Sequence, residues 1–93
     1  MKKKIQSLVA ALIEKHELTF GGETMMPDVD RVETHGEQKH VFFEDESIAY
    51  LIAGYVAASI YDELERGLTD LGYQAEDSDG CTWIISKISA HYS

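Results

Sequence analysis

Residues 48–61, IAYLIAGYVAASIY, are fourteen consecutive positions without a charge, and they decide the fold. Acidic residues stand on both sides of this uncharged run. Its length and its small residues favour a helix, and such a helix has apolar side chains around more of its circumference than a surface helix needs. We therefore expect the uncharged run to be covered on two sides, by its own domain or by a partner.

We predict one long central helix that begins at Asp45 or Ser47 and ends at Leu71. Acidic residues at its start suit the positive end of a helix dipole, and Gly72 stands where a left-handed residue commonly ends a helix. At about 100° per residue, one apolar stripe runs along most of this helix. Its members are Ala53, Ala57, Ile60, Leu64, Leu68 and Leu71.

A second apolar stripe lies on another face of the amino-terminal half of the predicted helix. It consists of Ile48, Leu51, Ile52, Tyr55 and Val56. Burying five large apolar side chains at ~1.5–3 kcal/mol each contributes roughly 7–15 kcal/mol, as much as the net stability of a domain, so they do not all face water. Either the amino-terminal helix covers them, or they form the seam of a homodimer.

The rest of the chain predicts one further helix and two β-hairpins. Apolar residues at helical spacing predict an amino-terminal helix over 3–16, and a glycine pair and a proline predict a loop after it. Strands are predicted over 29–35 and 39–43 around a turn at 36–38, and over 73–76 and 82–88 around a turn at 77–80. The order α-ββ-α-ββ indicates one α+β domain over 1–93, a two-layer sandwich with a small antiparallel sheet.

The formal charge of −9 is unevenly spread along the chain. Residues 1–15 carry +3 and the remaining residues carry −12. Such a surface repels nucleic acid and anionic lipid, so we expect neither to be a direct partner. A protein with a basic surface is its electrostatic complement.

The sequence also predicts a cytoplasmic location. Cys81 is the only cysteine, so an intramolecular disulfide is excluded. The start MKKK followed by apolar residues imitates a secretory signal, but Gln6, Ser7 and a charged end favour a helix. The uncharged run is too short to cross a bilayer, which needs ~20 apolar residues.

We find no pattern that predicts an enzyme, a metal site or a cofactor site. His35 and His40 flank one turn without a third ligand at a recognisable spacing. The stretch 77–80, DSDG, starts like a calcium loop but lacks the later glycine and glutamate of that motif. Cys81 can pair with His91 in principle, yet a small inert strand residue is the expected role.

Acidic clusters and one tryptophan are the predicted partner-binding residues. Each cluster also has a local explanation, such as helix capping, turn formation or a solvated helix face. With so few basic residues between them, we predict that some of these acids contact a basic partner, and that Trp83 anchors the contact. The predicted acids are Glu44, Asp45, Glu46, Asp62, Glu63, Glu65, Glu76, Asp77 and Asp79.

We predict a non-catalytic inhibitor or adaptor that binds a basic surface of a nucleic-acid-processing protein. In size, acidity and absence of motifs the chain resembles the small antirestriction and anti-CRISPR proteins of phages, which implies that it imitates the charge of a nucleic acid. The alternative is a homodimeric acidic chaperone, since the order of elements partly resembles type III secretion chaperones. Those chaperones are longer and end in a helix that is not predicted here.

Overall fold

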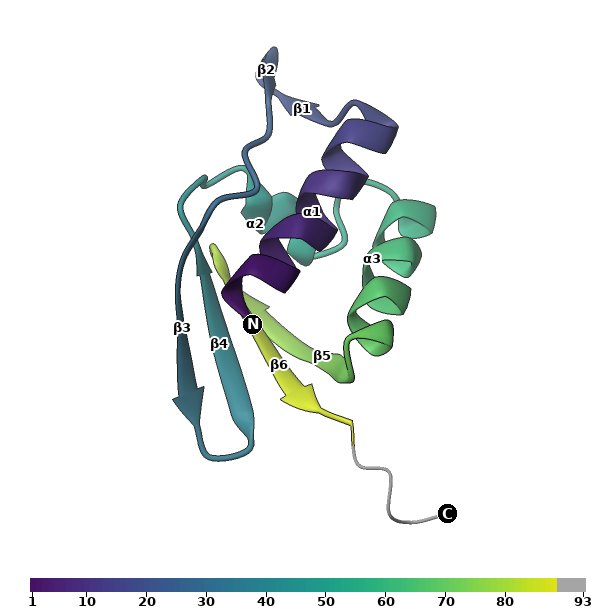
Figure 1. Ribbon diagram of the computed structural model, residues 1–93. Helices are drawn as coiled ribbons and strands as arrows, with labels where there is room; N and C mark the ends of the chain where they lie inside the picture. Colours follow the sequence, from purple (N-terminus) through teal and green to yellow (C-terminus); the bar gives the residue numbers. More distant parts are fainter. Residues whose placement is uncertain (89–93) are drawn as a thin grey trace.

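The protein folds as an α+β domain in which helices cover one face of an antiparallel sheet (Figure 1). A computed structural model describes residues 1–88. The helices are α1 (Lys2–His16), α2 (Ile48–Ile52) and α3 (Ala58–Asp70). The strands are β1 (Thr19–Phe20), β2 (Glu23–Thr24), β3 (Val29–His35), β4 (Gln38–Phe43), β5 (Tyr73–Asp79) and β6 (Thr82–Lys87).

The main sheet has the order β3-β4-β6-β5, and every neighbouring pair is antiparallel. The two predicted hairpins are therefore joined through β4 and β6, where Val41 faces Trp83 in the register. Because side chains alternate along a strand, Val41 and Trp83 share the face toward the helices and both are fully buried. The opposite face carries His40 and Ile84, which are half-buried, and is not covered by a helix.

The core forms between this sheet and the three helices. Helix α1 buries one stripe of four residues, and α3 buries Leu64 and Leu68. The two helices approach closely at Gly67, where an added Cβ atom would lie 2.2 Å from Cδ1 of Leu8. A small residue at this position thus permits the packing of α1 on α3. The stripe of α1 consists of Ile5, Val9, Leu12 and Ile13.

The predicted central helix is not continuous, which corrects the sequence prediction. It divides into α2 and α3, and Gly54 between them adopts a left-handed conformation with φ of +81°. That conformation is readily accessible to glycine and ends a helix. The two predicted stripes consequently belong to two helices with different directions, so α2 and α3 each bury their own apolar face.

Three further boundaries differ from the predictions. The segment predicted as a loop contains a small hairpin, in which Thr19 pairs with Thr24 and Phe20 with Glu23. Strand β5 continues to Asp79 because its register shifts between Ala75 and Asp77, as in a β-bulge. The prediction for β3 was correct, and β4 begins one residue before its predicted start.

Candidate functional site

Acidic residues from three connections of the fold gather at one end of the main sheet. The 44–46 loop joins β4 to α2, and the amide of Glu44 donates to the carbonyl of Asp28 at 3.0 Å. The turn between β5 and β6 lies beside this loop, because the amide of Phe43 donates to the carbonyl of Cys81 at 3.0 Å. We call this group of carboxylates the acidic end. It consists of Glu23, Asp28, Glu44, Asp45, Glu46 and Asp79.

The acids of α3 form a separate group, since α3 and the loop between β4 and α2 lie on different sides of the molecule (Figure 1). Glu63 accepts a hydrogen bond from Nζ of Lys15 at 2.6 Å and contacts Nε2 of His16 at 2.6 Å. These two contacts, Lys15 first, hold the pKa of Glu63 below its ordinary value. Glu63 therefore ties α1 to α3, while the neighbouring Asp62 is exposed and Glu65 is half-buried.

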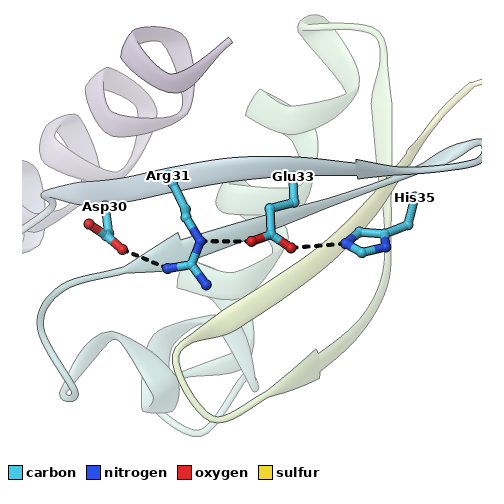
Figure 2. Close-up of polar contacts among 4 residues, drawn as sticks. All are labelled: Asp30, Arg31, Glu33 and His35. Atoms are coloured by element: carbon cyan, nitrogen blue, oxygen red, sulfur yellow. Dashed lines mark hydrogen bonds and ion pairs between the residues drawn. The ribbon is translucent and has the colours of Figure 1, made fainter.

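Arg31 is paired with acids of its own strand (Figure 2). Its guanidinium donates to Asp30 at 2.8 Å and to Glu33 at 2.8 Å, and its Cζ lies 3.9 Å from the centroid of the Phe42 ring. The hydrogen bond from Arg31, followed by one from His35, lowers the pKa of Glu33. Within residues 1–88, no basic side chain forms an ion pair with a carboxylate of the acidic end.

Asp45 differs from its neighbours because it holds the local structure together. Its carboxylate accepts hydrogen bonds from the amide of Met26 at 2.9 Å and from the amide of Ser47 at 3.0 Å. The Ser47 amide, and to a smaller extent the Met26 amide, lowers the pKa of Asp45. Asp45 thus fastens the segment before β3 to the start of α2, and Glu44 and Glu46 beside it are exposed.

Exposed apolar side chains lie beside these acids. The rings of Phe20 and Tyr50 stack with centroids 4.6 Å apart, although 48% of Phe20 and 45% of Tyr50 are exposed. Met26 and Tyr55 are 53% and 78% exposed. In the described part of the chain, these four are the exposed large apolar residues, and all of them come from two segments, 20–26 and 50–55, that the ring stack joins. Exposed apolar patches of this kind mark binding surfaces more often than scattered single residues do.

Two hollows border the ring of Phe20. The first has a volume of about 470 Å³ and is lined by Glu23 and Met26 among others. The second has a volume of about 360 Å³ and is lined by Tyr50, Ala49 and the turn at Gly80 and Cys81. Both hollows share the lining residues Phe20, Glu46 and Ser47.

Two further side chains, those of Ser47 and Cys81, border the hollows. Ser47 is 8% exposed, and its hydroxyl oxygen has no hydrogen-bond partner among the described residues. That hydroxyl lies near the carboxylate of Asp45, but it does not have the geometry of a hydrogen bond. Burial, and then the charges of Glu46 and Asp45, raise the pKa of the Cys81 thiol, so this thiol is protonated at neutral pH.

The remaining predicted partner-binding residues lie elsewhere. Asp77 lies on the edge strand β5, opposite Ile84 in the register. Glu76 accepts hydrogen bonds from the hydroxyl of Ser86 and from the side chain of Gln74. Trp83 is 0% exposed and belongs to the core, so in this fold it has no surface to offer as an anchor.

The predicted dimer seam is divided between the interior and the surface. Ile48, Leu51 and Ile52 are 0%, 1% and 2% exposed within the single chain. They pack in the core with α1 and the sheet and are therefore not available for a second copy. Val56 is half-buried and Tyr55 is exposed, because both follow the break at Gly54.

Other places in the described residues were weaker candidates. A hollow of about 690 Å³ lies at the other end of the sheet and is lined by charges of both signs, including Glu37, Lys39 and Lys87. The rings of His35 and His40 lie 4.3 Å apart. Residues 1–88 contain no group of three or more histidine, cysteine, aspartate or glutamate side chains arranged to hold a metal ion. His91 lies outside the described residues.

Within residues 1–88, no helix has the length and apolar character needed to cross a membrane.

Sequence reasoning missed the residues that make this site distinctive, namely Phe20, Met26 and Tyr50. The sequence predicts a loop in the region of Phe20 and does not single out Tyr50 within the uncharged run. A signal was present, because a phenylalanine before two glycines and a methionine before a proline place large apolar residues where the chain turns on the surface. The contact of Phe20 with Tyr50 depends on tertiary structure, so the sequence contains no local pattern that predicts it.

Comparison with known proteins found no similarity: no protein-family model, no curated protein and no solved structure matches this chain.

Proposed function

We propose that the protein is a small acidic, non-catalytic inhibitor or adaptor that binds a basic surface of a nucleic-acid-processing protein in the cytoplasm. The observation that carries the proposal is the acidic end, whose carboxylates lack basic partners within residues 1–88. Three of these acids, Glu23, Asp45 and Glu46, line a hollow together with the exposed ring of Phe20, which stacks on Tyr50. Carboxylates steer a basic partner, and aromatic rings supply contact area that excludes water. Neither role requires turnover.

The number of charges favours a local contact over imitation of a whole duplex. Duplex DNA carries one charge per ~1.7 Å, or about 18 phosphates along roughly 30 Å. The acidic end holds six carboxylates, and Asp45 among them accepts two backbone hydrogen bonds. We therefore infer that the protein covers one basic site of its partner.

Site-specific photocrosslinking tests this function. A benzoylphenylalanine at Tyr50 reports contacts of the acidic end, and the same residue at Ala11, an exposed position of α1, is the matched control. In lysate of the source cell, we expect a crosslink from position 50 to a nucleic-acid-binding protein, competed by excess duplex DNA and weakened at about 0.5 M salt. A crosslink that is weakened neither by excess duplex DNA nor by about 0.5 M salt contradicts the proposal.

Charge reversal provides the second arm of this test. Glu44→Lys with Glu46→Lys changes the charge by the same amount as Asp62→Lys with Glu65→Lys on α3. We expect the first pair to weaken binding of the crosslinked partner at least ten-fold, and the second pair to weaken it less than three-fold. Equal losses indicate that only net charge matters, and then the acidic end is not the contact.

Light scattering separates this function from that of a homodimeric chaperone. The proposed inhibitor binds its partner as a monomer, because most of the predicted seam lies in the core of one chain. A dimer at micromolar concentration that dissociates when Tyr55 is replaced by serine contradicts the monomeric form of the proposal.

A further inference from the structure

The smaller hollow beside the acidic end combines an apolar wall with a charged rim. The rings of Phe20 and Tyr50 form one side, and the turn at Cys81 forms the other. Ala49 also lines it, and Glu46 is the charged residue among its lining residues. Such a hollow has the composition of a binding site for a side chain that is itself apolar and stands beside a positive charge.

Exposed aromatic rings supply a second observation at the same place. Phe20 and Tyr50 line the smaller hollow, stack with ring centroids 4.6 Å apart, and are 48% and 45% exposed. Large apolar groups exposed together at a hollow mark a surface that a partner covers more often than scattered single residues do.

We propose that the smaller hollow receives an apolar side chain from a partner segment in which lysine or arginine flanks that side chain. The apolar side chain packs on Phe20 and Tyr50, and a flanking cation pairs with Glu46. This inference rests on the proposed function and specifies the partner: a basic segment with one large apolar residue at its centre.

Charge complementarity decides in favour of this occupant. The exposed rings favour any apolar group, but an acidic or neutral segment would leave the carboxylates of the acidic end unpaired next to a dry contact. A second copy of this chain is also disfavoured, because two acidic ends repel each other.

Short peptides provide the probe. Ac-KKLKK-NH2 carries the proposed features, Ac-KKSKK-NH2 lacks the apolar residue, and Ac-EELEE-NH2 lacks the positive charge. In amide NMR titrations of the full chain at low salt, we expect the leucine peptide to shift the signals of Phe20, Glu46, Ala49 and Cys81. We expect it to bind at least five-fold tighter than the serine peptide, and the acidic peptide to cause no shift.

Variants of the hollow make the test specific. Ala49→Leu fills the hollow, so it should bring the affinity of the leucine peptide down to that of the serine peptide. Ala11→Leu adds the same group on the exposed side of α1 and should change neither affinity. Glu46→Gln removes the charge that pairs with the flanking cation, so it should weaken the leucine peptide several-fold while the amide spectrum shows an intact fold.

Several outcomes overturn the inference: no detectable binding at millimolar peptide, equal affinities of the leucine and serine peptides, or shifts centred on α3. Its failure is distinguishable from failure of the proposed function. If the partner found by crosslinking is lost on reversal of Glu44 and Glu46 but retained by Ala49→Leu, the function holds and the apolar contact is refuted. If reversal has no effect on that partner, the function fails whatever the peptides do.

Discussion

Trp83 illustrates how the position of a single residue decides its role. Its indole is fully buried at the centre of the sheet, between Val41 of β4 and Ser78 of β5 in the register. The indole nitrogen Nε1 has no hydrogen-bond acceptor among the described residues. Trp83 therefore contributes apolar volume to the core and no hydrogen bond.

Two substitutions of Trp83 test this role. Trp83→Ala should lower the free energy of unfolding by about 3–5 kcal/mol, because it leaves a large cavity. Trp83→Phe should cost distinctly less, since the ring is retained and the lost N–H group had no acceptor. Urea denaturation measures both. A folded Trp83→Ala variant of unchanged stability contradicts the core role.

Glu63 is the residue for which a pH dependence follows from its contacts. Lys15 and His16 lower its folded-state pKa below the ordinary value of 4.5, so the folded form favours the ionised carboxylate. The stability contributed by these contacts is therefore fully present above that ordinary value and is lost as the pH falls through the lowered folded pKa. Glu63→Gln should remove this contribution.

The measurement is the free energy of unfolding of the native protein and of Glu63→Gln between about pH 7 and pH 3. The native protein should be the more stable of the two at neutral pH, and the difference should disappear at the acidic end of the range. Glu14→Gln on the exposed side of α1 is the control for loss of a carboxylate from the same surface, and it should change the stability at neutral pH less than Glu63→Gln does. A difference that grows on acidification contradicts the assignment.

At the scale of elements, the sequence allowed correct prediction of the faces but not of the break in the central helix. Helical spacing correctly identified Leu64 and Leu68 as buried in α3, and Ile48, Leu51 and Ile52 as buried in α2. The same spacing does not reveal that the two faces belong to separate helices. Gly54 within a small-residue run also fits a closely packed helix, and only the tertiary structure decides between the two conformations.

Gly54→Ala discriminates these conformations by the sign of its effect. In a continuous helix the change should stabilise the protein by about 1 kcal/mol. At the observed φ of +81°, alanine is strained, and we expect a loss of about 1 kcal/mol or more. The nearest atoms to an added Cβ belong to Tyr61 at 3.6 Å, an ordinary contact, so strain and not a clash causes the loss. Thermal unfolding decides the sign.

The strands show where the local sequence pattern is sufficient to predict the bounds of an element. β3 has the predicted bounds because Val32 and Thr34 alternate with charged residues and a glycine follows the strand, although its register also shifts between Val29 and Arg31. β1 and β2 have two residues each, which is too short for an alternation. β5 was predicted too short, since the bulge after Ala75 interrupts the alternation and Asp77–Asp79 resemble a turn.

At the scale of the molecule, the acidic clusters were visible in the sequence but their grouping was not. Asp28 and Asp79 lie near the cluster at 44–46 because β3 and β6 begin, and β4 and β5 end, at the same end of the main sheet. The acidic cluster of α3 is separate because α3 lies on a different side of the molecule from the loop between β4 and α2. The stack of Phe20 on Tyr50 joins residues that are remote in the sequence, which no local pattern encodes.

The gathered charge should destabilise the molecule at low salt. Raising the salt from about 0.02 M to 0.2 M shortens the Debye length from about 20 Å to about 7 Å, so repulsion within the acidic end is screened and stability should rise. Glu44→Gln with Glu46→Gln should stabilise the protein by about 0.5 kcal/mol at low salt and have little effect at high salt. Asp62→Asn with Glu65→Gln on α3 is the matched control and should gain less. Chemical denaturation at both salt concentrations checks this, and a larger gain from the control contradicts it.

The bulge in β5 has one more consequence. The main sheet has two edges, β3 and β5, and an uncovered strand edge is a template on which further chains can add and grow into fibrils. Asp30, Arg31 and Glu33 lie along one edge, while the bulge and the acids from Glu76 to Asp79 interrupt the other. Both edges therefore discourage strand addition, which works against polymerisation of the chain at the concentrations at which it meets a partner.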